Sequence, residues 1–282
     1  MLRSLLYVPA SSDKFLSRAH ERGADALILD LEDAVSPAEK PRARARLREA
    51  VPAAARNGAT IFVRINALAT GLALDDAQAA AEAGTYGLFV PKVHSADDLR
   101  QIAAHLDAVE RGHKVVLVAL LEDAAAVLDA RQIATGPRLF ALATGGEDLA
   151  TNMGAEPTPE VLRWPKLMVH MVAKATGLRS LGLLRSVADF SDTEAVRRAA
   201  REARAFGFDG ASCIHPSLVP ILNEAFAPTP EEIAHARAMI AAFDASVAAG
   251  AGAFALDGKM VDEPVVARAR ALLASLPPES RP

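Results

Sequence analysis

Residues 26–33 read Ala-Leu-Ile-Leu-Asp-Leu-Glu-Asp, an apolar run that ends in three acids. A run without polar alternation is typical of a parallel strand that is covered on both faces. The acids then alternate with leucine, so Asp30 and Glu32 share one face of the strand while Leu31 takes the other. This stretch predicts a buried strand whose carboxyl end carries side chains capable of chemistry.

The same arrangement recurs along the chain. Eight apolar runs are expected to form strands, at residues 4–8, 26–31, 60–65, 87–90, 115–121, 139–143, 181–187 and 210–214. Segments with helical periodicity alternate with them, at residues 13–22, 37–56, 72–83, 96–111, 123–133, 159–176, 192–206 and 216–225. Regular alternation of strands and helices predicts an α/β fold, either a (β/α)8 TIM barrel or a doubly wound sheet.

The polar residues that follow the strands favour the barrel. They are Asp30, Glu32 and Asp33 after the second strand, Arg64 after the third, Lys92 after the fourth, Glu122 after the fifth, Gly145-Gly146-Glu147-Asp148 after the sixth and His215 after the eighth. A barrel brings all these strand ends to one face, where the active sites of this fold lie, whereas an open sheet spreads them along a line. We therefore predict a TIM barrel catalytic domain over residues 1–226.

Residues 227–282 do not fit the eight units and predict a C-terminal helix with a lid or arm. Thr229-Pro230-Glu231-Glu232 has the pattern of a capping box, so a helix is expected to run to about Ala248. Asp257-Gly258 is a hairpin turn signal between two short apolar pieces, and a last helix is expected over 265–276.

Composition narrows the class of protein. The chain has 282 residues, of which 51% are hydrophobic and 23% charged, with a net charge of −4. This mild acidity argues against nucleic acid or an anionic membrane as a partner. No uncharged run is long enough for a membrane-spanning helix. The single cysteine, Cys213, excludes an intrachain disulfide framework and fits a cytoplasmic location.

Glu122 and Asp148 follow neighbouring strands in apolar surroundings. Two carboxylates at adjacent strand ends can hold one hard divalent cation such as Mg²⁺ and leave positions for substrate and water oxygens. The alternative is that each acid caps the helix that follows it. On the residue types alone, both interpretations stay open.

Arg64 ends a buried strand. Its planar fork can hold a carboxylate or an oxyanion as charge develops on it, or it can form a structural ion pair with Asp30, Glu32 or Asp33. We expect Asp30 mainly to orient a basic residue, and Lys92 either to bind an anion or to pair with the same acids.

Two further groups give weaker signals. His215, before Pro216, is more often a hydrogen-bonded loop histidine than a base. The stretch from Pro9 to Lys14 opens the first helix, and its amides, its two hydroxyls and Lys14 can receive a phosphate, although Ser-Ser-Asp is also an ordinary helix cap.

Taken in order and spacing, these motifs resemble the citrate lyase β-subunit-like family, which includes malyl-CoA, β-methylmalyl-CoA and citramalyl-CoA lyases. The resemblance runs from about Arg3 to about Leu273. It rests on eight motifs: Arg3-Ser4-Leu5-Leu6-Tyr7-Val8-Pro9, Asp30-Leu31-Glu32-Asp33-Ala34-Val35, Val63-Arg64-Ile65-Asn66, Val90-Pro91-Lys92, Leu120-Leu121-Glu122, Gly145-Gly146-Glu147-Asp148-Leu149, Ile214-His215-Pro216 and Gly258-Lys259-Met260-Val261-Asp262.

The resemblance implies a TIM barrel that assembles as a homotrimer or hexamer. It also implies the roles of site residues: Mg²⁺ on Glu122 and Asp148, Arg64 on the 2-oxo acid, coenzyme A near Lys14, and a lid that brings Asp262 to a neighbouring subunit's site as general acid or base. We also assign Gly146 and Glu147, in the turn before Asp148, to substrate binding.

The chain departs from the family pattern at three places. Asp123 follows the metal-binding glutamate, where the family usually has Thr or Ser. Trp164-Pro165-Lys166 stands where members often have Tyr-x-Arg, and Gly210-Ala211-Ser212-Cys213 lacks a lysine that many members have. These departures concern the substrate more than the fold.

The expected function is a Mg²⁺-dependent carbon–carbon lyase of the oxo-acid-lyase type. It would cleave a 3-hydroxyacyl-CoA of the malyl-, citramalyl- or citryl-CoA type to acetyl-CoA and a small 2-oxo acid. The alternatives are a pyruvate-type aldolase that acts on free hydroxy acids and a non-catalytic homologue that binds coenzyme A or an oxo acid. The lid with Asp262 favours the thioester enzyme, and the presence of Glu122, Asp148 and Arg64 argues against a silent homologue.

Overall fold

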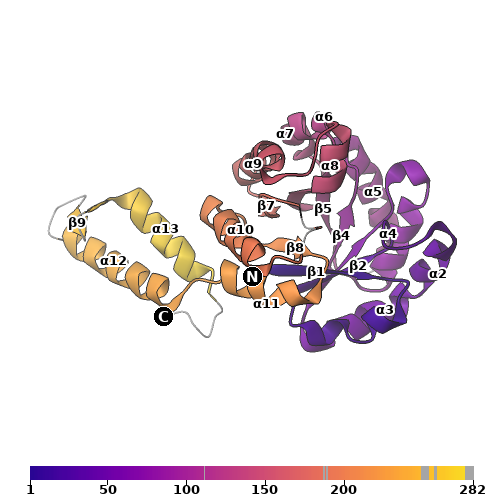
Figure 1. The fold of residues 1–282 in the computed structure, drawn as a ribbon, viewed down its shortest axis with the longest axis horizontal. Coiled ribbons are helices and arrows are strands. Elements are labelled where there is room, and N and C mark those ends of the chain that lie inside the picture. Colours follow the sequence, from indigo (N-terminus) through magenta and orange to yellow (C-terminus); the bar gives the residue numbers. More distant parts are fainter. Residues whose placement is uncertain (111, 187, 189, 249–253, 257–258, 277–282) are drawn as a thin grey trace. The chain divides into compact units, whose positions relative to one another are not determined.

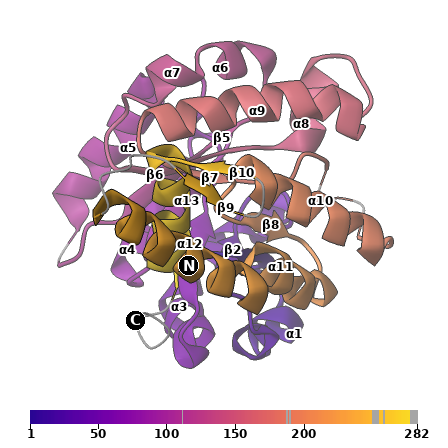
Figure 2. The ribbon, with the colours of Figure 1, turned by 90° about the vertical axis from the view of Figure 1, so that its left-hand side faces the viewer.

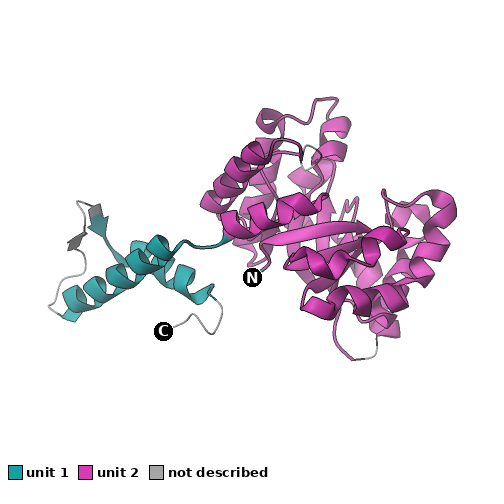
Figure 3. Cartoon of the chain, turned by 60° about the horizontal axis from the view of Figure 1, so that its bottom comes forward, with its two compact units in different colours: residues 1, 227–282 teal, residues 2–226 magenta. Residues whose placement is uncertain are grey.

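The computed structural model describes residues 1–110, 112–186, 188, 190–248, 254–256 and 259–276. The chain divides into two compact units, one made of Leu2–Phe226 and the other of Met1 with Ala227–Pro282 (Figure 3). We describe each unit by itself.

Eight parallel strands form the centre of the larger unit (Figure 1). They are β1 (Ser4–Pro9), β2 (Ala26–Asp30), β3 (Thr60–Arg64), β4 (Gly87–Val90), β5 (Val116–Leu121), β6 (Leu139–Thr144), β7 (Arg179–Leu181) and β8 (Ala211–Cys213). Their spatial order is β7-β6-β5-β4-β3-β2-β1-β8. The two ends of this order meet, because Leu181 bridges Gly210 and the N–H of Gly182 donates to the carbonyl of Gly210 at 2.9 Å. The sheet is therefore a nearly closed barrel, as predicted.

Helices surround the strands (Figures 1 and 2). The α-helices are α1 (Asp13–Leu16), α2 (Lys40–Ala45), α3 (Leu47–Ala54), α4 (Ala73–Glu82), α5 (Ala96–Val109), α6 (Ala124–Leu128), α7 (Ala130–Ile133), α8 (Gly146–Asn152), α9 (Pro159–Ala175), α10 (Thr193–Phe206) and α11 (Val219–Phe226). Short 3₁₀ turns are η1 (Ala19–Arg22), η2 (Pro37–Glu39), η3 (Ala55–Asn57), η4 (Leu68–Thr70) and η5 (Pro216–Leu218).

Two expectations about these elements are wrong. The seventh strand, expected over 181–187, ends at Leu181, because Gly182 takes a φ of +151° that a strand does not use. The segments expected as single helices at 37–56 and 123–133 are each broken into shorter helices. In addition, α8 was not expected at all.

The barrel has an inner and an outer apolar layer, because successive strand residues point to opposite faces. The inner layer is small and is filled by Leu5, Ala26, Ile28, Phe62, Phe89, Val118, Leu120, Ala141, Ala143 and Leu181. The outer layer packs the other face of the strands against the helices. Because the alternation continues, Asp30, Arg64 and Glu122 fall on the inner side at the carboxyl ends of β2, β3 and β5. The fold thus brings polar groups together at the carboxyl ends of the strands, next to the apolar inner layer.

The smaller unit contains α12 (Pro230–Ala248), an antiparallel pair formed by β9 (Phe254–Leu256) and β10 (Lys259–Val261), and α13 (Glu263–Ala274). The expected capping box is present, since Glu232 N–H donates to Thr229 Oγ1 at 3.2 Å and Thr229 N–H donates to Glu232 Oε2 at 2.8 Å. The predicted turn at Asp257-Gly258 lies outside the described residues. Among the described residues, no helix is long and apolar enough to cross a membrane.

Candidate active site

A pocket of about 450 Å³ opens at the carboxyl ends of the strands, a size typical of small-molecule sites. Seven of the predicted site residues line it: Asp30, Asp33, Arg64, Glu122, Gly146, Glu147 and Asp148. These residues come from four different strand ends. The pocket therefore unites the groups proposed for the metal with the arginine proposed for the oxo acid.

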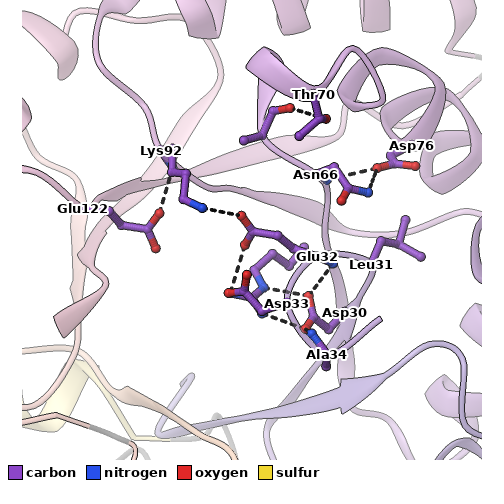
Figure 4. A network of polar contacts seen from close by, with 12 residues as sticks. Asp30, Leu31, Glu32, Asp33, Ala34, Asn66, Thr70, Asp76, Lys92 and Glu122 are labelled. Carbon is purple, nitrogen blue, oxygen red and sulfur yellow. Dashed lines mark hydrogen bonds and ion pairs between the residues drawn. The ribbon is translucent and has the colours of Figure 1, made fainter. Parts of the chain in front are cut away.

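Glu122 is 6% exposed and is held from the neighbouring strand end. Its Oε2 accepts a hydrogen bond of 2.9 Å from the backbone N–H of Lys92 (Figure 4). Burial, and then the charge of Glu32, raise the pKa of Glu122 to about 8. A buried carboxylate with acidic neighbours is unfavourable when ionised, and a bound cation would relieve that cost.

The diglycine turn after β6 leaves room for this carboxylate. A Cβ on Gly145 would lie 2.8 Å from Cγ of Glu122 and would overlap its carboxylate, so a larger residue would force Glu122 to shift. Gly145 precedes α8, and Asp148 stands exposed in the first turn of that helix. This close approach to Glu122 accounts for the first of the two glycines.

The donor set fits Mg²⁺. Glu122 and Asp148 supply hard carboxylate oxygens, and Mg²⁺ is usually bound by only one or two carboxylates. Larger groups, of three or more His, Cys, Asp or Glu placed to hold a metal, do not occur among the described residues. A site with two acidic ligands keeps most of its coordination positions for water and substrate oxygens. That openness suits a cation that takes part in chemistry rather than one that supports the fold.

Arg64 is fixed by acids from β2. Its Nε and Nη2 each donate to a different oxygen of Asp30 at 2.6 Å, and its Nη1 donates to Asp33 Oδ2 at 3.1 Å. The guanidinium also lies 4.9 Å from the ring centre of Tyr7. Burial alone would lower the pKa of Arg64, but the bonds to Asp30 raise it overall, so the group stays charged.

The structural pair that the sequence offered as the alternative for Arg64 is therefore present. This pairing does not use all the hydrogen-bond donors of Arg64. A guanidinium has five N–H donors, and Arg64 forms three side-chain hydrogen bonds to described residues. Asp30 is the main partner of Arg64. It orients Arg64 and also accepts hydrogen bonds from the backbone N–H groups of Glu32 and Ala34, which form the loop after β2.

Glu32 lies between two cations behind the pocket wall. Its Oε1 is 3.6 Å from Lys92 Nζ and its Oε2 is 3.0 Å from Arg64 Nη1. Burial raises its pKa to about 7 in spite of Arg64. Figure 4 shows Lys92 reaching both Glu122, through its backbone, and Glu32, through its side chain. Lys92 and Glu32 thus contact the residues that line the pocket without lining it themselves.

Besides Glu32 and Lys92, three other predicted residues do not line the pocket. Lys14 is exposed on α1 with its Nζ 5.9 Å from the ring centre of Phe15. His215 is exposed, stacks on Phe190 with ring centres 4.8 Å apart, and its Nδ1 lies 2.7 Å from Ser217 Oγ, which is the loop role expected of it. Asp262 belongs to the smaller unit, where its Oδ1 accepts a hydrogen bond of 3.4 Å from Val265 N–H and caps α13.

The extra acid beside the proposed metal ligand, Asp123, is directed elsewhere. Its Oδ1 accepts a hydrogen bond of 2.8 Å from Ala126 N–H and caps α6, and its Oδ2 lies 2.8 Å from His94 Nδ1. The carboxylate of Asp123 therefore interacts with a helix start and with a histidine.

Sequence reasoning missed three residues that shape this pocket. Tyr7 lies under Arg64, and Lys166 forms part of the wall. Lys40 fixes the loop after β2, because its Nζ donates to the carbonyls of Leu31 and Glu32 at 2.9 and 2.8 Å. The position of Tyr7 on the inner face of the first strand was a usable signal. No pattern in the sequence marks Lys40, whereas Lys166 belongs to the Trp164-Pro165-Lys166 stretch that departs from the family's Tyr-x-Arg.

Comparison with known proteins identifies the family of the chain. The model of the HpcH/HpaI aldolase/citrate lyase family matches residues 3–216.

The chain belongs to the HpcH/HpaI aldolase/citrate lyase family.

The family resemblance and the enzyme class expected from the sequence, a carbon–carbon lyase, are thereby confirmed. A citrate lyase subunit beta-like protein of Deinococcus radiodurans is 35% identical, with 97% of each chain covered. A (3S)-malyl-CoA thioesterase of Cereibacter sphaeroides is also 35% identical and covers 96% of this chain and 93% of its own.

A solved relative supports both the fold and the cofactor. Protein CitE of Mycobacterium tuberculosis, in complex with magnesium, acetoacetate and coenzyme A, is 32% identical, with a TM-score of 0.81 and 96% of each chain covered. The predicted cofactor, Mg²⁺, is the metal in this member of the family.

Proposed function

We propose that this chain is a Mg²⁺-dependent lyase that cleaves a 3-hydroxyacyl-CoA of the malyl-, citramalyl- or citryl-CoA type to acetyl-CoA and a small 2-oxo acid. The observation that carries the proposal is the meeting of Glu122, Asp148 and Arg64 in one pocket. The coenzyme A and acetoacetate bound by the M. tuberculosis relative support the choice of a thioester and a small oxo acid.

Glu122 and Asp148 are the residues that would hold the metal. Bound Mg²⁺ supplies a Lewis acid that chelates the carboxylate and hydroxyl of the acid half and makes the hydroxyl easier to deprotonate. Lys92 N–H keeps Glu122 in place, and Gly145 lets the backbone of the next loop approach it.

Arg64 would stabilise the oxygen that changes from hydroxyl to carbonyl. Negative charge develops on this oxygen as the hydroxyl loses its proton, and the charge then passes to the thioester enolate as the carbon–carbon bond breaks. Fixed donors aimed at the developing charge lower the barrier to forming the alkoxide. Asp30 holds the guanidinium by two hydrogen bonds, so the arginine does not need to reorganise during the reaction. The N–H groups of Arg64 that Asp30, Asp33 and Glu32 leave unused are those available to the substrate. Gly146 and Glu147, in the turn beside it, would contact the acid half.

The proton that the acetyl carbon gains has to come from a group that is not bound to the metal. We assign this exchange to Asp262 on the C-terminal unit, brought to the site by a neighbouring subunit in a homotrimer or hexamer. Lys14 would bind coenzyme A through its phosphates. We also propose a cytoplasmic location, which the single buried and free cysteine, Cys213, supports.

Hydrolysis of the thioester is the second candidate, because one relative is named a malyl-CoA thioesterase. An aldolase acting on free hydroxy acids and a silent binding homologue are the remaining alternatives. Separate calorimetric titrations with Mg²⁺, a 2-oxo acid and coenzyme A, together with an assay for thioester conversion, distinguish the lyase from the aldolase and from the silent homologue. The lyase must bind all three, the aldolase should bind no coenzyme A, and a silent homologue should bind its ligands but convert no thioester.

A further inference from the structure

Lys166 places a buried ammonium on the wall of the active-site pocket. It lies on α9, is 4% exposed and lines the same pocket as Glu122 and Asp148. Its Nζ donates one hydrogen bond of 2.9 Å, to the carbonyl of Arg185. With the described residues it forms no other hydrogen bond and no ion pair within 4 Å. Since an ammonium has three N–H donors, two are available to a ligand.

The ammonium lies beside the diglycine turn. A Cβ on Gly146 would be 3.5 Å from Lys166 Nζ and 3.0 Å from Leu162 Cδ1, so the absence of a side chain there leaves the space next to Nζ open. Gly145 approaches Glu122 in the same way. The two glycines therefore lie next to the proposed metal ligand and next to Lys166, and both groups face one pocket.

Lys166 differs from Arg64, the other cation among the residues that line the pocket. Arg64 is neutralised by Asp30, with Glu32 and Asp33 close to its Nη1. The carboxylate that acts on Lys166 through space is that of Glu147 on α8, and Glu147 Oε1 accepts a hydrogen bond from Ser186 Oγ instead. Lys166 is thus a cation on the pocket wall without a carboxylate within ion-pair distance among the described residues.

A buried charge that lacks a partner is costly, and an anionic ligand would remove the cost. Burial lowers the pKa of Lys166 to about 8, so the group is still largely charged at neutral pH. The metal and Arg64 are already assigned to the first carboxylate and the oxo oxygen of the acid half. A second anionic group on that half would have the ammonium as its partner.

We infer that Lys166 binds a second carboxylate on the acid half of the substrate. The preferred 2-oxo acid is then a dicarboxylate, and the thioester is of the citryl rather than the malyl or citramalyl type. This inference rests on the proposed function and narrows its substrate class. Lys166 acts as a specificity-determining residue, in addition to linking α9 to the backbone at Arg185.

The test uses two acids that differ at one group. Oxaloacetate carries the second carboxylate, and 2-oxobutyrate has a methyl group in its place. Each freshly dissolved acid is titrated calorimetrically into the full chain with Mg²⁺ present. Lys166→Gln keeps a donor for the Arg185 carbonyl but loses the charge, and Lys166→Arg keeps the charge. Lys174→Gln is the matched control, because Lys174 lies on the same helix and pairs with Asp209 at 2.6 Å, away from the residues that line the pocket.

We expect Lys166→Gln to weaken oxaloacetate binding about tenfold or more, the effect of losing a charge-assisted hydrogen bond, and to change 2-oxobutyrate binding less than about twofold. Lys166→Arg and Lys174→Gln should keep the preference for oxaloacetate. Equal losses for both acids, or no loss, would overturn the inference and leave Lys166 a structural clamp. If the wild-type chain bound neither acid, the proposed function itself would fail.

A second measurement needs no variant. The preference of the wild-type chain for oxaloacetate over 2-oxobutyrate should decrease as the pH rises through about 8, because Lys166 loses its proton there. The ratio of the two affinities cancels effects on the metal site that both acids share. Glu147 is the charged group that acts on Lys166 through space. A constant ratio between pH 6.5 and 9 would contradict the assignment.

Discussion

The backbone N–H of Lys92 donates a hydrogen bond of 2.9 Å to Oε2 of Glu122, so the end of β4 holds the carboxylate that follows β5. Lys92 has a φ of +50°, an uncommon conformation for a residue other than glycine, and it follows Pro91. The turn thereby aims an N–H at the proposed metal ligand. Such an arrangement fixes one oxygen of Glu122 and leaves the other toward the diglycine turn.

The first prediction concerns the metal. Glu122→Gln and Asp148→Asn should each weaken Mg²⁺ binding at least about tenfold, the smallest effect expected even for a residue that only supports a ligand. An amide is a poorer ligand than a carboxylate for a hard cation. Calorimetric titration with Mg²⁺ measures this directly.

Asp123→Asn is the matched control for the metal prediction. Asp123 is the next residue after Glu122, but its carboxylate caps α6 and contacts His94. Asparagine is also a good helix cap, so Mg²⁺ affinity and stability should change little. Unchanged Mg²⁺ affinity in both Glu122→Gln and Asp148→Asn would show that these two residues do not bind the metal.

The second prediction concerns Arg64. Lysine keeps the charge but loses the fork that grips Asp30, so Arg64→Lys is not conservative. Turnover should fall at least about tenfold, which corresponds to ~1.4 kcal/mol of transition-state stabilisation. Steady-state kinetics with the thioester substrate provides the measurement.

Arg3→Lys controls for the loss of a two-point ion pair. Arg3 grips Asp25 through Nε at 2.8 Å and Nη2 at 2.7 Å, just before β1 and β2 begin, at the opposite end of the strands from the pocket. This variant should lose stability without losing turnover. If Arg64→Lys kept wild-type kinetics, Arg64 would be only a structural partner of Asp30.

The third prediction concerns the stability cost of Lys166. Burial lowers its pKa from the ordinary 10.5 to about 8, so between these values the unfolded chain binds more protons than the folded chain. The free energy of unfolding of the wild type should therefore rise with pH across this window. Urea unfolding of Lys166→Met should lack this rise.

Below pH 8, Lys166→Met should be more stable than the wild type, by up to about 3 kcal/mol less the hydrogen bond to the Arg185 carbonyl. A gain in stability with a loss of function is expected where a charge is kept buried for binding. A destabilised methionine variant at all pH values would show that the link to Arg185 outweighs the cost of burial.

The fourth prediction concerns the C-terminal unit. Asp262→Ala should abolish lyase turnover while Mg²⁺ and oxo-acid binding persist. Mixing Asp262→Ala with Asp148→Asn, each inactive alone, should restore activity under conditions that let subunits exchange. Some mixed sites would then unite an intact metal centre with an intact lid. No recovery, with exchange demonstrated independently, would mean that the sites are not shared or that Asp262 is not catalytic.

The strand ends of the barrel were predictable from local pattern. Side chains alternate between the inner and outer faces of β2, and this alternation continues through Asp30 and Glu32, which share one face. It depends only on the order of residues along the chain. The same reasoning holds for Arg64 and Glu122. Their convergence follows from the fold, because a barrel has one carboxyl face.

Other features depend on contacts that local pattern does not encode. The seven-residue helix α8 is too short for a periodic signal, and β7 ends where Gly182 changes the backbone. Lys166 belongs to a stretch that departs from the family pattern, but nothing in the sequence shows that its ammonium is buried. Only the packing of α9 against β6, β7 and α8 buries its ammonium beside Gly146.

The most direct measurement of the central claim is the identity of the products from a 3-hydroxyacyl-CoA incubated with the chain and Mg²⁺. The account predicts acetyl-CoA and a 2-oxo acid in equal amounts, without free coenzyme A thiol, and loss of the reaction in Asp148→Asn and after chelation of the metal. Release of free thiol together with the intact hydroxy acid, and no oxo acid, would contradict it and identify a thioesterase.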